Sequence, residues 1–551
     1  MDSCVFMMWV FAHPLPLKKV INTIDCISVQ GTRPMETTYI VLLALLVIYI
    51  PIYFYVRKSK KAQDKGFAPY GPTIMIKTKW GLKLMDSLAK YRRFWNFMGH
   101  ISLVISLILA IFIVTILLID LSVLPSMFGK TNMGIEYALA IPGLNPMLPI
   151  VYGIIGLVVA MVFHELAHGI QSRANDIKVN SSGILYGVVP LGAFVEPDEE
   201  ETEKASRKAR MHVYAAGITT NTFLAVITFA IMFVMMTSCL TCAYGGNAAV
   251  NAIVSDTEAA DLDIEASSII ISVDGIDMDI DGIEDYLNSN ADGTLRQYNV
   301  KFLYKGTEYT HNMALGTCIV GVTSDSPAEA VGMKKGGYLL TIDTGSGPVN
   351  IGTPEKFSDV MKATAPEQAV RITYVNYDSA SRSYSAPIDT DWFTLGTNGD
   401  IGYLGVSTTL AGMSLTTPDT VVDYGINPFH GREGLQGYAL GALAYVSMPF
   451  KGYSPIPESV TWWFDNSDAF WIVVWTLYWI FWLDIVLAVS NALPALPFDG
   501  GLLLVGALDW MYEKGGVRDE KSREQYVRAT TNVISYSMLG ILILVLVAII
   551  I

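Results

Sequence analysis

The sequence predicts a polytopic α-helical membrane protein with a large polar region inserted between two of its membrane spans. Of the 551 residues, 52% are hydrophobic and only 16% are charged. This composition is too apolar for an ordinary soluble enzyme. Apolar runs long enough to cross a bilayer recur along the chain, and a long stretch of mixed polarity, Ser238–Asp465, separates two of them.

Six apolar runs approach or exceed the roughly 20 residues that a membrane-spanning helix needs. We expect spans at about Tyr39–Val56, Ile101–Ile119, Leu148–Ile170, Val213–Met236, Ala469–Ser490 and Ala529–Ile551. The weaker run Tyr438–Phe450 is interrupted by glycine and proline, which favours a re-entrant or interfacial piece. The start lacks the basic residues of a secretory signal, and we hypothesise that translation begins at Met35.

The charge distribution predicts how the chain is oriented in the membrane. Basic residues far outnumber acidic ones between Arg57 and Arg93, so the loop between the first two spans is expected to be cytoplasmic. Counting spans from this loop places Ser238–Asp465 outside the cytoplasm. That outer region is strongly acidic and the chain has a net charge of −14, which argues against a nucleic acid as a partner.

The third span ends in the sequence His164-Glu165-Leu166-Ala167-His168. Two histidines four residues apart lie on one face of a helix and can hold one metal ion, while the glutamate is close enough to act on a bound water. Ionisable side chains are costly inside a bilayer, so such a cluster indicates a functional site. The pattern is typical of a zinc hydrolase; a chance occurrence on a packed helix is the alternative.

A second polar motif, Asn491–Gly501, follows the fifth span. By the count of spans it reaches the same side of the membrane as His164 and His168, so we expect the two motifs to converge. Asp484, in the middle of the fifth span, is either a rival metal ligand or a buried group hydrogen-bonded to a neighbouring helix. The glycines after Asp499 favour Asp499 instead, because they let the backbone approach a metal.

The outer region contains an internal repeat. Val250–Asp256 aligns with Ile319–Asp325, and the match continues through a short helix and a buried strand. The second copy resembles a PDZ domain and the first resembles it more distantly, so we predict tandem PDZ-like domains at 244–316 and 317–410. This resemblance implies grooves that bind peptide C-termini by adding a strand to a sheet edge. The alternative is that both units are spacers that restrict access to the membrane site.

Taken together, the HExxH sequence in one span, the Asn-x-x-Pro-x-x-x-x-Asp-Gly sequence Asn491–Gly500 after a later span and the inserted PDZ-like units resemble the site-2 protease family of intramembrane zinc metalloproteases. The resemblance covers residues 145–237 and 469–505. The segment Gly183–Glu201 is similar to the loop that follows the HExxH helix in this family. Ala216–Asn221 lacks a proline that the family often has there, which puts the local turn in doubt.

The family resemblance implies roles for individual residues. His164, His168 and Asp499 would bind Zn²⁺, and Glu165 would be the general base. Asn491 and Asn221 would contact the substrate or the oxyanion. The same ligand types also suit Co²⁺ or Fe²⁺.

The predicted function is a zinc metalloendopeptidase that cleaves transmembrane segments of membrane proteins near the cytoplasmic side, as in regulated intramembrane proteolysis. A non-catalytic membrane receptor or scaffold that binds peptides through the PDZ-like domains is the alternative, and a metal transporter is a third reading. The apolar stretch Ile184–Val195 either forms a strand that receives unwound substrate by edge pairing or packs beneath the helices.

The predicted organisation combines these expectations. It comprises an N-terminal segment 1–34, which is not translated if Met35 is the start; two spans with the basic loop, 35–120; a membrane core with the first motif, 121–237; the PDZ-like domains 244–316 and 317–410; an extracytoplasmic linker, 411–468; a membrane core with the second motif, 469–511; and a cytoplasmic loop with the last span, 512–551.

Overall fold

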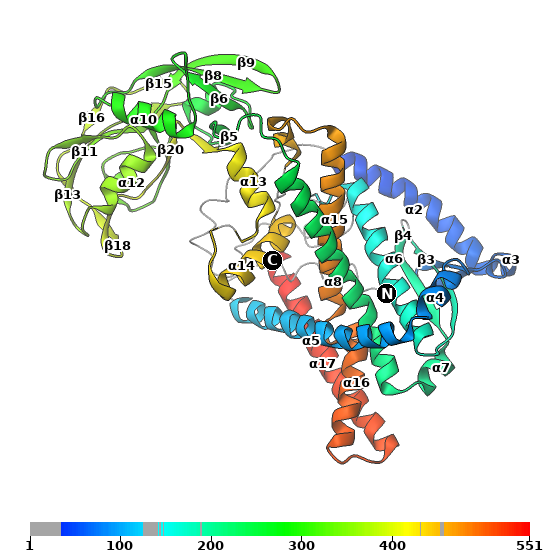
Figure 1. Ribbon diagram of the computed structural model, residues 1–551. Helices are drawn as coiled ribbons and strands as arrows, with labels where there is room; N and C mark the ends of the chain where they lie inside the picture. Colours follow the sequence, from blue (N-terminus) through cyan, green and yellow to red (C-terminus); the bar gives the residue numbers. More distant parts are fainter. Residues whose placement is uncertain are drawn as a thin grey trace.

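A bundle of long helices carries a β-rich region at one end (Figure 1). The computed structural model describes residues 35–550 apart from 125–141, 143, 144, 147, 188, 189, 430 and 452–456. The segment 1–34, and with it the hypothesis that translation starts at Met35, lies outside the described residues.

Five helices within the described part of the chain are long and apolar enough to cross a membrane. They are α5 (Arg92–Val123), α6 (Ile150–Ala174), α8 (Arg207–Ser238), α15 (Asp468–Asn491) and α17 (Glu520–Ile550). Each falls on one of the expected apolar runs, which confirms a multi-helix apolar bundle. The remaining run also forms a helix, α2 (Met35–Lys58), with Pro51 inside it. The count of six spans stays a prediction.

Helices α8 and α15 form the centre of the bundle, with α6 packed against both. Gly156 permits this packing, because a Cβ there would lie 2.9 Å from the Trp479 carbonyl oxygen. Trp482 is fully buried, and its indole N–H donates to the Val446 carbonyl at 2.8 Å. The weaker run forms α14 (Gly434–Ser447) and a 3₁₀ helix (Met448–Lys451), shorter than a span.

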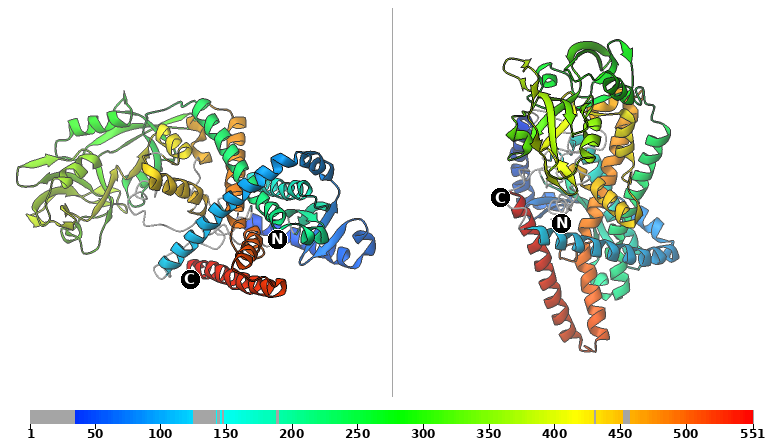
Figure 2. Two further views of the ribbon diagram at one scale, coloured as in Figure 1. Left: turned by 60° about the horizontal axis from the view of Figure 1, so that its bottom comes forward. Right: turned by 90° about the vertical axis from the view of Figure 1, so that its left-hand side faces the viewer.

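The last two helices, α16 (Asp499–Lys514) and α17, form a hairpin that projects from the end of the bundle opposite the β-rich region (Figure 2). Asp509 on α16 fixes this hairpin to α8. Its carboxylate accepts from Arg207 Nε at 2.5 Å and from Arg523 Nε at 2.6 Å. Burial opposes ionisation, but these two bonds lower the pKa of Asp509 below its ordinary value.

A four-stranded antiparallel sheet lies beside α6, with the order β1–β2–β3–β4. Its strands are β1 (Phe67–Tyr70), β2 (Thr73–Thr78), β3 (Val179–Tyr186) and β4 (Pro190–Pro197). Ile76 of β2 pairs with Ile184 of β3, so the basic loop after α2 and the segment after α6 lie at the same end of the bundle. The short helices α3 (Lys60–Gln63), α4 (Leu82–Ala89) and α7 (Glu199–Lys204) connect these elements.

The β-rich region has one sheet that passes through two units with separate apolar cores. The first unit contains β5 (Ala249–Ile253), α9 (Glu258–Asp261), β6 (Ile269–Val273), β7 (Ile276–Asp277), α10 (Ile280–Asn290), β8 (Gln297–Tyr304) and β9 (Thr307–Ala314). The second contains β10 (Thr317–Val322), α11 (Pro327–Ala330), β11 (Tyr338–Asp343), β12 (Pro348–Asn350), α12 (Pro354–Lys362), β13 (Ala369–Val375) and β20 (Val406–Leu410).

Smaller elements complete the region and join it to the bundle. They are β14 (Tyr377–Asp378), β15 (Ser383–Tyr384), β16 (Ile388–Asp389), β17 (Phe393–Thr394), β18 (Gly396–Asn398), β19 (Ile401–Tyr403), β21 (Met413–Thr416), α13 (Pro418–Ile426) and a 3₁₀ helix (Glu458–Trp463).

The internal repeat appears in the backbone as a repeated order of elements. From β5 to β8 and from β10 to β13, each unit runs strand, short helix, strand, short strand, helix, strand. Asp256 and Asp325 occupy the same place in the two copies, and both have φ of +59°. Strand β21, within the expected linker, pairs with β5 and completes the first unit. The identification of the units as PDZ-like, and their boundaries, stay predictions.

Candidate metal centre

Helix α6 places two imidazoles on the face that it turns toward α8. His164 and His168 are one turn apart, so their side chains lie above one another. Their ring centroids are 4.8 Å apart and their Nε2 atoms are 3.2 Å apart. Both side chains are largely buried, at 8% and 12% exposure, whereas the exposed face of α6 carries apolar residues.

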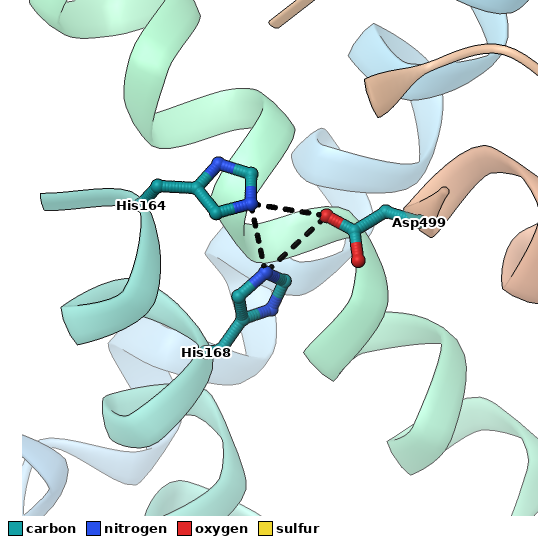
Figure 3. Close-up of side chains that lie close together, drawn as sticks. All are labelled: His164, His168 and Asp499. Carbon is teal, nitrogen blue, oxygen red and sulfur yellow. Dashed lines mark hydrogen bonds and ion pairs between the residues drawn. The ribbon is translucent and has the colours of Figure 1, made fainter. Parts of the chain in front are cut away.

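Asp499 brings the third ligand-type atom to the same point from the start of α16 (Figure 3). Its Oδ2 lies 3.3 Å from His164 Nε2 and 3.2 Å from His168 Nε2. The three ligand atoms all lie within 4.8 Å of one another. Two nitrogens and one carboxylate oxygen form a donor set that suits zinc.

The backbone of α8 fixes the orientation of one imidazole. His168 Nδ1 lies 2.7 Å from the Val213 carbonyl oxygen, so this nitrogen carries the proton and donates it. The lone pair of Nε2 is then directed toward His164 and Asp499. Metal-binding histidines are commonly held in this way through their second nitrogen.

Glycines let the surrounding backbone come close to the three side chains. A Cβ at Gly217 of α8 would lie 2.5 Å from His164 Cε1 and 2.6 Å from His168 Nε2. A Cβ at Gly500 would lie 2.4 Å from the carbonyl oxygens of Ala492 and Leu493, in the turn before Asp499. A Cβ at Gly501 would lie 2.5 Å from the Ala495 carbonyl oxygen in the same turn. The space around the imidazoles therefore depends on the absence of a side chain at Gly217, and the close packing of α16 on the turn before Asp499 depends on Gly500 and Gly501.

Glu165 lies beside the three-residue cluster and faces strand β4. Its Oε2 accepts a hydrogen bond from the Val195 N–H at 3.0 Å. Because this N–H bonds to Glu165 and not to β3, it belongs to the free edge of the sheet. A carboxylate therefore lies between the open edge of β4 and the ligand cluster.

Comparison with known proteins agrees with this geometry. Residues 152–535 match Peptidase family M50, the site-2 protease family, and this segment includes all three clustered residues. The chain belongs to family M50. The family is zinc-dependent and membrane-embedded, so the resemblance noted from the motifs is confirmed at the level of the family. The scaffold alternative is not favoured by membership in a peptidase family.

A protein from another organism is similar to part of the chain. An uncharacterized protein of Methanocaldococcus jannaschii is 35% identical over 190 residues, which are 33% of this chain and 48% of the relative. The chain thus spans about half the length of this relative.

The other polar residues singled out in the spans lie outside the three-residue cluster. The side-chain amide of Asn491 donates to the Leu487 carbonyl of its own helix at 3.1 Å. Asn221 and Asp484 are fully buried, and neither side chain has a hydrogen-bond partner among the described residues. Neither alternative for Asp484 is found among the described residues, because its carboxylate is not part of the three-residue cluster and no hydrogen bond joins it to a neighbouring helix there.

Sequence reasoning missed the contribution of α8 to the M50 site. The stretch from Ala216 to Asn221 drew attention for its missing proline and for Asn221, but not for Gly217, and α8 runs through it as an unbroken helix. Gly217 is the residue there that touches both imidazoles. A glycine inside a long apolar helix, where it is normally unfavourable, was the available signal.

Proposed function

We propose that this member of family M50 is an intramembrane zinc endopeptidase that hydrolyses peptide bonds within transmembrane segments of other membrane proteins. The observation that carries the proposal is the convergence of His164, His168 and Asp499 inside an apolar helix bundle, with Glu165 next to them. Three protein ligands with room for a fourth position are what a catalytic zinc site requires.

Each residue then has a defined role. His164, His168 and Asp499 hold the metal ion. When bound, zinc supplies Lewis acidity that activates water for attack on a peptide carbonyl. Glu165 accepts the proton of the attacking water and later gives it to the leaving amine. The Val195 N–H holds the Glu165 carboxylate in place before the substrate arrives.

The free edge of β4 supports a mode of substrate binding. A helical substrate hides its peptide groups in its own hydrogen bonds and must unwind locally before it is cleaved. Among the described strands, β4 pairs only with β3, so its other edge can receive an extended segment by strand addition. Such a segment would lie next to Glu165, since Val195 on that edge contacts it.

The sidedness of the proposal rests on charge and topology. The basic loop from Arg57 to Arg93 favours the cytoplasm, and its strand β2 shares a sheet with β3 and β4 at the metal centre. We therefore place the active site toward the cytoplasmic side and the two β units outside, at the far end of α8 (Figure 1). Substrates are transmembrane proteins in the lipid bilayer, and cleavage there fits regulated intramembrane proteolysis. Binding of peptide C-termini by the β units is a further part of this proposal.

The test is cleavage of a transmembrane substrate by purified protein in detergent, with the zinc content of each variant measured. We expect Glu165→Gln to keep zinc and lose cleavage, and Asp499→Asn to lose both. Glu199→Gln, on the exposed start of α7, is the matched control and should behave as wild type. Cleavage by Glu165→Gln at the wild-type rate would refute the proposal.

A further inference from the structure

A cavity lies where α16 and α17 meet, and helix α8 contributes to both this cavity and the metal centre. The cavity volume is about 690 Å³, within the range of ligand-binding pockets. Side chains of α8, of the turn before α16, of α16 and of α17 line it, including Arg210, Tyr214, Leu496, Asp509 and Thr531. The three clustered residues of the metal centre are not part of its lining.

One face of α8 connects this cavity with the metal centre. Arg210, Tyr214 and Gly217 are spaced by four and three residues, so they form one stripe along the helix. Gly217 contacts the two imidazoles, whereas Arg210 and Tyr214 line the cavity. At 1.5 Å per residue, Arg210 lies about 10 Å along the helix from Gly217.

The inner part of the cavity presents an available positive charge. Arg207 and Arg523 are occupied by Asp509. In contrast, no ion pair or side-chain hydrogen bond joins the Arg210 guanidinium to a residue that the structure describes. Thr531 lines the same cavity; it is 1% exposed, and its hydroxyl has no hydrogen-bond partner in the described part of the chain.

Asp509 is paired with Arg207 and Arg523, and the other acidic residues of the lining form its exposed rim. Glu203, Glu520 and Glu524 are exposed, whereas Arg210 is only partly exposed. A ligand that enters past this rim therefore meets a free guanidinium and a free hydroxyl. A carboxylate satisfies both, because guanidinium and carboxylate form strong charge-assisted hydrogen bonds and a hydroxyl can donate to the same group.

We propose that this cavity is a substrate subsite in which Arg210 and Thr531 bind an acidic side chain of the polypeptide being cleaved. An extended chain rises about 3.3 Å per residue, so the 10 Å along α8 corresponds to about three residues from the scissile bond. Arg210 is then a specificity-determining residue. This inference rests on the proposed peptidase function and deepens it by defining the substrate class.

The first experiment compares substrates that differ in one residue. Transmembrane substrates carry either Glu or Gln at each position from two to four residues on either side of the cleaved bond, and kcat/KM is measured for each pair. We expect wild type to favour Glu about tenfold at one of these positions, the size of one charge-assisted hydrogen bond. Arg210→Gln should reduce this ratio to about one. Lys208→Gln, exposed on the same turn of α8 and outside the cavity lining, should keep it.

A binding experiment separates the subsite from the chemistry. The same Glu and Gln peptides, labelled with a fluorophore, are titrated into the Glu165→Gln protein and followed by anisotropy. We expect the Glu peptide to bind more tightly, and Arg210→Gln to remove this difference. If wild type cleaves no substrate but this binding preference is present, the proposed function fails and the subsite stands.

Other outcomes overturn the subsite. Equal kcat/KM for Glu and Gln at every tested position, together with equal binding, would refute it even if cleavage is efficient. A Glu preference that survives in Arg210→Gln would also refute it. Should Arg210→Gln fail to fold, Arg210→Lys is used instead, because it keeps the positive charge and is expected to retain a Glu preference. Loss of the Glu preference in Arg210→Lys would count against an electrostatic subsite.

Discussion

The substitution Gly217→Ala should weaken metal binding without removing any ligand. Gly217 lies in the interior of α8, and a Cβ there would lie 2.5 Å from His164 Cε1 and 2.6 Å from His168 Nε2. Ordinary carbon contacts are about 3.5 Å or longer. Either the imidazoles or α8 must therefore move by about 1 Å.

That displacement is large for a metal site. Ligand distances in such sites are reproduced to within about 0.2 Å, so a shift of about 1 Å exceeds the tolerance several times. Changes around the ligands that disturb their orientation typically cost about 10- to 100-fold in metal affinity. We expect a loss of this size for zinc, with a matching loss of cleavage at limiting zinc. Helix propensity acts in the opposite direction, because alanine favours a helix by about 1 kcal/mol over glycine.

The assay is zinc affinity by competition with a chelator, combined with thermal unfolding of the metal-free protein. Gly540→Ala is the matched control, since Gly540 lies in helix α17 and a Cβ there meets nothing within 4 Å. The control should keep wild-type zinc affinity. If Gly217→Ala also binds zinc as tightly as wild type, the close approach of α8 does not shape the site and the reasoning fails.

Three further predictions concern the β-rich region and the helices that carry the site. Burial and the nearby Glu355 carboxylate raise the pKa of Glu284 to about 7. The protonated Glu284 side chain therefore stabilises the fold fully below its ordinary pKa, and this contribution is lost as the pH rises through about 7. Glu284→Gln should raise the unfolding temperature at pH 8 and leave it unchanged at pH 4. The Leu496 N–H, in the turn before Asp499, donates to the Ser535 hydroxyl at 3.0 Å. Ser535→Ala removes this acceptor and should lower the free energy of unfolding by about 1–3 kcal/mol and weaken zinc affinity. Ser535→Thr should restore both. Asp509→Asn leaves Arg523 without its carboxylate partner and leaves Arg207 paired with Glu513 alone. It should lower the unfolding temperature by weakening the attachment of the last two helices to α8, an effect that high salt should not reproduce in wild type.

Those parts of the bundle and its site that follow from a single local sequence pattern were predictable. Long apolar runs determine helices because a bilayer leaves the backbone few alternatives, and the described helices follow those runs. Histidines four residues apart must share a helix face, so His164 and His168 were placed by periodicity. Asp499 required a second argument, the count of spans, which brought it to the same end of the bundle.

What the sequence did not show depends on contacts between distant segments. Strand β21 completes the first β unit although it follows the second unit in the chain, and no local pattern indicates which of the two similar units a short strand joins. Asp484 is another example, since its carboxylate has no hydrogen-bond partner in the part of the chain that the structure describes. Two polar residues on neighbouring helices favour a hydrogen bond in principle, but helix rotation decides whether they face each other.

Close backbone approach connects these observations with the chemistry. The ligands come from α6 and α16, and α8 lies against both, so each interface must be narrow enough for three short side chains to meet. Gly217 removes a side chain where α8 faces the imidazoles, and Gly500 and Gly501 remove two where α16 packs on the turn before it. A side chain at any of these positions would separate helices that the ligands must bring together. The histidines and the aspartate are therefore not sufficient to specify the site, and chains that keep them but lose these glycines should form a weaker metal centre.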